Sequence, residues 1–298
     1  MRKLFFALLA LCACRSERAS SASPSVQVDT GRVAISGGSL YYESAGSGET
    51  LVLLHGGNLD RRMWDVQFAL LRQHHHVVRY DARGFGRSSA ADQAFAAHDD
   101  LTALLQALKI SHATLIGLSM GGRIAIDFAL AHPEVVDRLI LAAPGISGGH
   151  WAEDGDSLWQ KKARIAAKKQ DSVGVALAWL ESAYIRTALQ SPEQVAFVRD
   201  IVMDNARFWS GIVRHGNLER DAEPPAADRL SELHMPILLM VGGNDTPFIK
   251  DVARAISGNA PHVKRVDIPG VGHMLNLEAS EQFDREVLSF LASASPSK

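Results

Sequence analysis

The sequence contains very little cysteine, because Cys12 and Cys14 are the only two among its 298 residues. The chain beyond residue 14 therefore has no disulfide bond and no thiolate ligand for a metal ion. Neither sign of charge dominates, since 31 lysines and arginines face 33 aspartates and glutamates. A formal net charge of −2 provides no basic surface for a nucleic acid, so we predict no nucleic-acid partner.

The first residues differ in character from the rest of the chain. Arg2 and Lys3 precede an apolar run from Leu4 to Ala13, which is too short to cross a bilayer as a permanent helix. A positive segment followed by an apolar run of this length is typical of a secretory signal. We therefore expect an exported protein that is periplasmic, anchored to a bacterial membrane or secreted.

The end of this segment resembles a bacterial lipoprotein signal. Residues 11–14 read Leu-Cys-Ala-Cys, and cleavage before Cys14 would leave that residue to be lipidated. We predict a signal over residues 1–14 and a tether over residues 15–25, which are rich in serine and alanine. Membrane attachment through Cys14 is one outcome, and ordinary cleavage that releases a soluble protein is the other.

The rest of the chain has the composition of a folded protein, with 47% hydrophobic and 21% charged residues. Apolar runs typical of buried strands alternate with helical patterns. The predicted strands are Val26–Ile35, Ser39–Tyr42, Leu51–Leu54, His76–Tyr80, Ala113–Ile116, Leu139–Ala143, Ile237–Val241 and Val263–Ile268. The predicted helices include Met63–Leu71, Ala94–Leu108, Arg123–Leu130 and Leu275–Leu291. This alternation predicts an α/β fold with a mainly parallel, doubly wound sheet.

One region, residues 147–231, breaks the alternation and shows only helical patterns. These patterns cover Leu158–Lys169, Val173–Leu189 and Pro192–Val213. We predict a helical cap here, inserted into a core formed by residues 26–146 and 232–298. Four of the five tryptophans fall in this region, and we expect them to pack the cap onto the core and to roof a pocket: Trp151, Trp159, Trp179 and Trp209. A group of basic residues is expected to form the solvated face of a helix: Lys161, Lys162, Arg164, Lys168 and Lys169.

The most informative motif surrounds Ser119, which has glycines two residues before and two residues after it. An apolar run precedes the motif and a helical pattern follows it, which is the sequence form of a nucleophile elbow. The turn is so sharp that the serine backbone is strained, and side chains at the glycine positions would collide with neighbouring backbone. The turn holds the hydroxyl clear of the sheet, beside a helix N-terminus that favours negative charge. Ser119 is therefore the candidate nucleophile.

A serine hydroxyl needs a general base, and the base needs a carboxylate to orient it. After an elbow of this kind, the acid and then the base follow in the chain. Asp245 comes directly after the strand Ile237–Val241, at the strand end where α/β sites form. His273 lies in a glycine-bracketed loop between the last strand and the last helix, a position that distinguishes it from the other 11 of the 12 histidines. We predict that Ser119, Asp245 and His273 are the catalytic residues.

The negative charge that develops on the substrate needs two hydrogen-bond donors. We expect one from the backbone N–H of Met120 and the other from Gly57, in the loop after the first parallel strand. Asn58 is a further candidate for this role or for contact with the substrate, whereas His55 is expected to shape the loop. No metal site is predicted, because the histidines at positions 74–76 lack a partner at ligand spacing. The expected chemistry needs no metal or organic cofactor.

Five motifs in this order resemble those of the α/β-hydrolase family, over the range Ser39–Leu291. They are the His-Gly-Gly at 55–57, the loop Asp81–Ser88, the elbow, the turn ending in Asp245 and the loop ending in His273. The resemblance implies that Ser119, Asp245 and His273 form the triad of that family and that Asp81–Ser88 is structural. Family members that hydrolyse epoxides or displace halide have an aspartate at the elbow, so Ser119 disfavours those activities.

We therefore expect a serine hydrolase that cleaves a small-molecule carboxylic ester, lactone or related acyl substrate. Hydrolysis of a carbon–carbon bond of the meta-cleavage type is an alternative, as is acyl transfer or perhydrolysis by the same triad. A protein that keeps the fold and only binds a ligand is the non-enzymatic alternative. The sequence sets neither the exact substrate nor the oligomeric state.

Overall fold

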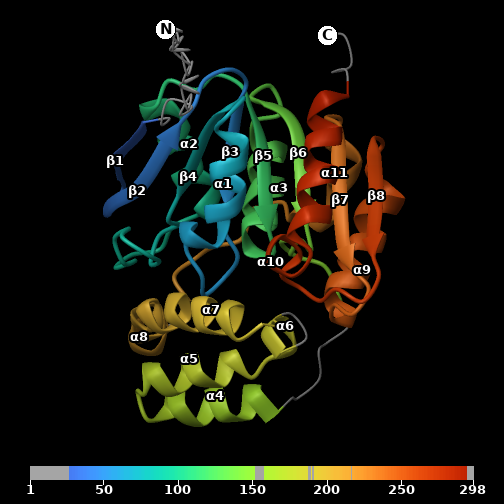
Figure 1. Ribbon diagram of the computed structural model, residues 1–298. Helices are drawn as coiled ribbons and strands as arrows, with labels where there is room; N and C mark the ends of the chain where they lie inside the picture. Colours follow the sequence, from blue (N-terminus) through green and yellow to red (C-terminus); the bar gives the residue numbers. More distant parts are fainter. Residues whose placement is uncertain (1–26, 152–157, 187–188, 190, 216, 294–298) are drawn as a thin grey trace, which may run out of the picture.

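The computed structural model describes residues 27–151, 158–186, 189, 191–215 and 217–293 (Figure 1). The predicted signal over residues 1–14, with Cys14, and the tether over residues 15–25 lie outside the described residues. None of the described helices is long and apolar enough to cross a membrane.

An eight-stranded sheet forms the centre of the fold, in the order β1-β2-β4-β3-β5-β6-β7-β8. The strands are β1 (Val28–Ile35), β2 (Gly38–Ala45), β3 (Thr50–Leu54), β4 (His76–Tyr80), β5 (Ala113–Leu118), β6 (Val136–Ala142), β7 (Ile237–Gly242) and β8 (Val263–Ile268). β2 pairs antiparallel with β1 and with β4, and every other neighbouring pair is parallel. The prediction of a mainly parallel α/β sheet is confirmed.

Helices cover both faces of the sheet, which explains why the central strands read as continuous apolar runs. All residues of β5 and β7 are buried. The helices are η1 (Arg61–Trp64) with α1 (Asp65–Leu71), α10 (Leu275–Glu278) and α11 (Ser280–Ala292) on one side, and α2 (Ala97–Ala107), α3 (Met120–Ala131) and α9 (Pro247–Asn259) on the other (Figure 1). On the first side, the rings of Trp64 and Phe283 pack with their centroids 5.9 Å apart. The core therefore lies in two layers against one sheet.

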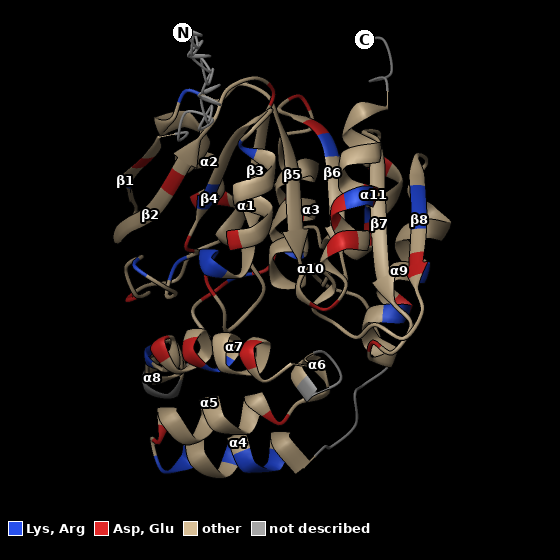
Figure 2. Ribbon diagram, viewed as in Figure 1, with Lys and Arg blue, Asp and Glu red and all other residues tan. Residues whose placement is uncertain are grey.

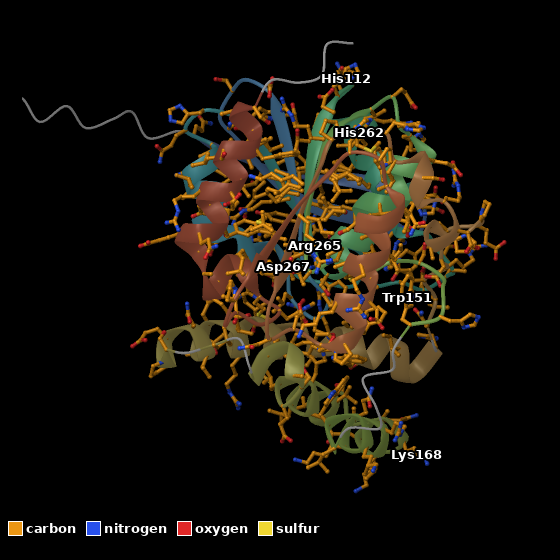
Figure 3. All side chains as sticks on the ribbon, turned by 90° about the vertical axis from the view of Figure 1, so that its right-hand side faces the viewer. His112, Trp151, Lys168, His262, Arg265 and Asp267 are labelled. Carbon is orange, nitrogen blue, oxygen red and sulfur yellow. The ribbon has the colours of Figure 1, made fainter. Side chains whose placement is uncertain are left out.

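The amino and carboxyl ends of the parallel strands form two opposite edges of the sheet, and these have different neighbours. Val28 begins β1 opposite Ala45, and Ala45 pairs with Val77 near the start of β4, so the chain enters β1 at the amino edge of the parallel strands. His112 and His262, which precede β5 and β8, mark this edge in Figure 3, far from Lys168. The cap lies beyond the carboxyl edge (Figure 1).

Among the described residues, five α-helices lie between β6 and β7: α4 (Leu158–Lys168), α5 (Ser172–Leu180), α6 (Ala183–Arg186), α7 (Pro192–Asp204) and α8 (Ala206–His215). The short turns η2 (Ala226–Asp228) and η3 (Leu230–Glu232) precede β7. This arrangement is a helical cap on an α/β core, as predicted, although the domain boundaries at residues 147 and 231 stay a prediction. The basic residues of α4 and of the turn after it are exposed, on the side of the cap away from the sheet (Figure 2).

Three predicted helices are each interrupted. The pattern Val173–Leu189 is broken between α5, which ends at Leu180, and α6, which begins at Ala183. The pattern Pro192–Val213 is broken at Asn205, whose side chain donates to Asp60 Oδ2 at 2.9 Å and accepts from the Gly86 N–H at 2.6 Å. The final helix is broken at Ala279, with φ −130° and ψ 47°, between α10 and α11. At Asn205 the break is explained by contacts with the core, which lie outside the local sequence.

Ser147 joins the two chain segments that lead into and out of the cap. Its hydroxyl donates to Asp127 Oδ1 at 2.6 Å and accepts from the Ala226 N–H at 3.0 Å. The Ala227 N–H also donates to the Ser147 carbonyl at 3.1 Å. Both ends of the cap are therefore fixed to α3 at one point.

Candidate active site

Ser119 occupies the sharp turn between β5 and α3, with φ 55° and ψ −112°. A Cβ atom at Gly117 would lie 2.4 Å from the Gly121 carbonyl oxygen, and one at Gly121 would lie 2.1 Å from that of Leu54. Neither position has room for a side chain, so both glycines are required for this backbone approach. The strained serine conformation is of the kind found at functional sites.

Ser119 lines a cavity of about 180 Å³ between the carboxyl edge of the sheet and the cap. The lining residues are Gly56, Gly57, Asn58, Leu59, Leu118, Ser119, Trp179, Tyr184, His273 and Met274. The structure therefore brings Ser119 and His273, which are 154 positions apart in the numbering, to one cavity.

His273 and Asp245 form a buried pair, with 4% and 5% of their surfaces exposed. His273 Nδ1 lies 2.9 Å from Asp245 Oδ2 and 3.1 Å from Oδ1. The Thr246 N–H donates to Asp245 Oδ1 at 2.7 Å, which fixes the carboxylate. An imidazole that donates from Nδ1 presents the lone pair of Nε2, the arrangement required of a general base.

No hydrogen bond joins the Ser119 hydroxyl to His273 among the contacts of the described residues. Catalytic hydrogen bonds are often longer in unliganded enzymes and tighten when the substrate binds. The geometry thus supplies an oriented imidazole and the hydroxyl of a half-buried serine in one cavity.

Backbone hydrogen bonds hold the Asp245 turn against the His273 loop. The Asn244 N–H donates to the Val271 carbonyl and the Gly243 N–H to the Ile268 carbonyl, both at 2.8 Å. Because the two segments are joined along their backbones, the distance between acid and imidazole is set by the framework of the sheet.

Glu278 is a residue of this site that the sequence reasoning missed. Its carboxylate accepts from the N–H groups of Gly272 at 2.6 Å and Met274 at 2.8 Å, which flank His273. Burial raises the pKa of the Glu278 carboxyl to about 7 and the charge of Asp245 adds to the rise, against the lowering effect of the two N–H donors and His273. The signal in the sequence is an acidic residue one short helix after His273.

The predicted oxyanion donors lie close together beside Ser119. Met120 is the first residue of α3, so its N–H has no acceptor within the helix. A Cβ atom added at Gly57 would lie 3.8 Å from Met120 Cβ, so the loop that carries Gly57 lies beside the start of α3. Asn58 also lines the cavity, has φ 62° and has a buried Oδ1 without a hydrogen-bond partner.

His55 shapes its loop and lies outside the lining of the Ser119 cavity. Its Nε2 accepts from the Ala82 N–H at 2.9 Å, so Nδ1 carries the proton and donates to the Gly56 carbonyl at 2.8 Å. Complete burial lowers the pKa of the imidazole, which keeps it neutral. His55 thus links the loop that carries Gly57 to the loop Asp81–Ser88.

The loop Asp81–Ser88 is held by internal and neighbouring hydrogen bonds. Asp81 accepts from the N–H groups of Arg61 at 3.0 Å and Arg87 at 2.8 Å. The Ser88 hydroxyl accepts from the Tyr41 N–H at 2.9 Å. These contacts agree with the structural role predicted for this loop.

The tryptophans of the cap have different surroundings. Trp179 lines the Ser119 cavity together with Tyr184, whose ring lies 4.7 Å from that of His273 in an edge-to-face arrangement. The other three, Trp151, Trp159 and Trp209, are partly buried against the hydrophobic core. One tryptophan therefore roofs the cavity and the others pack the cap. Within the described residues, no cluster of three His, Cys, Asp or Glu side chains is arranged to bind a metal ion.

The sequence of this chain matches the family model described as "alpha/beta hydrolase fold" over residues 49–280. The chain belongs to the α/β-hydrolase family. It is 29% identical over 260 residues to a pimeloyl-[acyl-carrier protein] methyl ester esterase of Pectobacterium carotovorum, covering 84% of this chain and 98% of that one. It is 28% identical over 268 residues to a 2-hydroxy-6-oxononadienedioate/2-hydroxy-6-oxononatrienedioate hydrolase of Burkholderia vietnamiensis, covering 85% and 90%.

Solved structures of α/β-hydrolases agree with this assignment. A thermophilic esterase from Thermogutta terrifontis superposes with a TM-score of 0.73 at 25% identity, covering 90% of this chain and all of that one. The protein is thus an enzyme of the α/β-hydrolase class, and these relatives are named as hydrolases or esterases.

Proposed function

We propose that this α/β-hydrolase cleaves a carboxylic ester, lactone or related small-molecule acyl substrate through an acyl-enzyme on Ser119. The observation that supports the proposal best is the shared cavity of Ser119 and the Asp245-paired imidazole of His273. Likeness to the methyl ester esterase and to the thermophilic esterase favours the ester as substrate.

In the proposed reaction, Ser119 Oγ attacks the substrate carbonyl while its proton passes to His273 Nε2. Asp245 stabilises the imidazolium that forms, and the N–H groups of Met120 and Gly57 donate to the oxyanion. The bond between the carbonyl carbon and the leaving oxygen then breaks, and that oxygen takes the proton from His273. Water, activated by the same imidazole, attacks the acyl-enzyme and releases the acid with a free Ser119.

The direct test combines covalent labelling with substitution of the nucleophile. A fluorophosphonate probe is expected to label the wild-type enzyme on Ser119 and to leave Ser119→Ala unlabelled. Hydrolysis of p-nitrophenyl acetate and butyrate should fall by about 10⁴-fold or more in the variant, because the nucleophile is lost. Equal activity in the two proteins would exclude this mechanism.

Hydrolysis of a carbon–carbon bond is the second candidate, because the relative from Burkholderia vietnamiensis is named as a hydrolase of a 2-hydroxy-6-oxo dienedioate. In that reaction the leaving group is a carbon atom, and the same imidazole would supply its proton. A vinylogous diketone acid and p-nitrophenyl butyrate distinguish the two candidates. The larger kcat/KM identifies the reaction for which the cavity is suited.

A further inference from the structure

A second cavity, of about 50 Å³, lies beside the Ser119 cavity. Its walls come from the core loops at 82–85 and 90–97, from α3, from α8 and from the returning segment at 217–219. The two cavities have no lining residue in common within the described part of the chain. Met120 lies between them, since it lines the second cavity and a Cβ atom added at Gly57, which lines the first, would lie 3.8 Å from Met120 Cβ.

Hydrocarbon dominates the lining of this second cavity. Its larger apolar members are Phe85, Phe95, Ile124, Phe208, Ile212 and Leu218. Phe85 of the core stacks on Phe208 of the cap, with ring centroids 4.1 Å apart. The Phe95 N–H donates to the Leu218 carbonyl at 3.0 Å, which joins another part of the wall across the boundary between core and cap. The cavity is therefore formed by both parts of the enzyme.

The charged side chains in this wall are occupied by other partners. Arg83 donates to both carboxylate oxygens of Asp100, at 2.8 and 2.6 Å, and Glu219 accepts from Arg123 at 2.6 Å. Arg207 donates to the carbonyls of Gly86 and Ser88. The surface left for a ligand is thus apolar, and an ionised ligand would have to compete with existing ion pairs.

The proposed reaction indicates which group on the reacting carbon lies toward the second cavity. His273 must pass its proton to the leaving oxygen, so the leaving group lies on the His273 side, beneath Trp179 and Tyr184. The oxyanion lies between the N–H groups of Met120 and Gly57. The remaining substituent of the tetrahedral carbon is the acyl chain, and the second cavity beside Met120 is the apolar space available to it.

We propose that this second cavity binds the acyl chain of the substrate and selects a short, unbranched, apolar chain. The inference rests on the proposed function, whose acyl-enzyme it extends. An apolar cavity of about 150 Å³ accommodates benzene, so a cavity of about 50 Å³ accommodates roughly the end of a propanoyl or butanoyl group.

Gly211 provides a way to fill the cavity without a steric conflict. It lines the cavity from α8, and a Cβ atom added there meets no atom within 4 Å apart from its chain neighbours and the backbone of its own helix. Gly258, in α9, has the same open surroundings and lies outside both cavities. Gly211→Phe and Gly258→Phe are therefore a matched pair, and Leu218→Ala enlarges the same cavity.

The experiment measures kcat/KM for p-nitrophenyl acetate, butanoate, hexanoate and octanoate. We expect Gly211→Phe to lower the butanoate-to-acetate ratio by about tenfold or more, and Leu218→Ala to move the optimum to a longer chain. Gly258→Phe should keep the wild-type ratios. The melting temperature of each variant shows whether it is folded.

Unchanged chain-length ratios in folded Gly211→Phe and Leu218→Ala would overturn the assignment of the cavity. A change confined to a series of alcohols on one acyl group would overturn it as well, because the cavity would then bind the leaving group. If the wild-type enzyme neither turns over these esters nor reacts with the phosphonate probe, the proposed function itself fails. The two failures are therefore distinguishable.

Discussion

The two sides of the active site are attached to the protein in different ways. On the core side, Ser119, Asp245 and His273 follow the ends of β5, β7 and β8. Backbone hydrogen bonds join the segments that carry the acid and the imidazole. We infer that the core positions the catalytic residues, whereas the cap determines which substrates reach them.

On the cap side, side chains make many of the described contacts with the core. Asn205 connects α7 to Asp60 and Gly86, and Arg62 of the core pairs with Asp204 at 2.9 Å. Such contacts can be altered without change to the sheet. Substitutions on the core side should therefore act mainly on kcat, and those on the cap side on KM and substrate choice.

The largest effect is expected from Asp245→Asn, which tests the core side directly. The amide cannot hold the Nδ1–H tautomer of His273, so kcat for p-nitrophenyl butyrate should fall by about 10⁴-fold. Asp267→Asn, at an exposed carboxylate beside Arg265 (Figure 3), is the control with the same change of charge. A loss of activity below tenfold in Asp245→Asn would show that this carboxylate does not orient the base.

Glu278→Gln should have an intermediate effect. The Glu278 carboxylate accepts from two backbone N–H groups. In the amide, the NH2 group would face one of these N–H donors and repel it, so we expect the His273 loop to be displaced. We expect kcat to fall between about 10- and 100-fold with little change in KM. Glu281→Gln, on the exposed side chain of α11, provides the control. Equal kcat values in the two variants would contradict a positioning role.

The same carboxyl makes stability depend on pH. The Glu278 pKa is raised from 4.5 to about 7 in the folded enzyme, so the unfolded chain releases this proton at lower pH. Between about pH 4.5 and 7 the folded state binds more protons, and the stability that Glu278 contributes falls as the pH rises. Urea unfolding at several pH values should show this fall in the wild type relative to Glu278→Gln. A constant difference between the two proteins would contradict the assignment.

Asn205→Ala tests the cap side. Loss of the carboxamide leaves the Gly86 N–H without its acceptor, so the free energy of unfolding should fall by about 1–3 kcal/mol. KM should rise more than kcat falls, because the catalytic residues stay in place. Asn259→Ala is the matched control, since Asn259 and Asn205 each donate to the carbonyl four residues before, both at 2.8 Å. Equal losses of stability in the two variants would contradict the role of Asn205 in connecting the cap to the core.

The smallest effect on catalysis is expected from Cys14→Ser. We propose that the enzyme is exported and that Cys14 is lipidated, on the basis of the N-terminal sequence pattern. The substitution should abolish incorporation of radiolabelled palmitate and leave kcat and KM unchanged. A mature protein that begins after residue 14 would contradict lipidation.

Much of the fold was predictable because its central strands, such as β5 and β7, are buried along their whole length. The predicted bounds of β4 and β8 coincide with those in the structure, and the acid and the base follow strand ends in the expected order. Ser119 was recognisable because the turn requires glycines at fixed spacing on both sides of it. These features depend on local sequence.

The features that the sequence did not predict depend on distant contacts. The break at Asn205 results from Asp60 and Gly86, more than a hundred residues earlier. The second cavity draws its walls from residues 82 to 219, so no single segment has its pattern. Glu278 accepts hydrogen bonds from backbone N–H groups, which every residue except proline has, so the residue types around it do not reveal these contacts.

The point where the chain enters the sheet has a consequence for how the enzyme faces its surroundings. Because β1 starts at the amino edge, a support attached to residues before Val28 would be connected to the fold on the side opposite the cavity. A parallel strand of six residues, such as β5, spans roughly 20 Å. On a surface-attached molecule, the length of the strands would therefore separate the point of attachment from the Ser119 cavity.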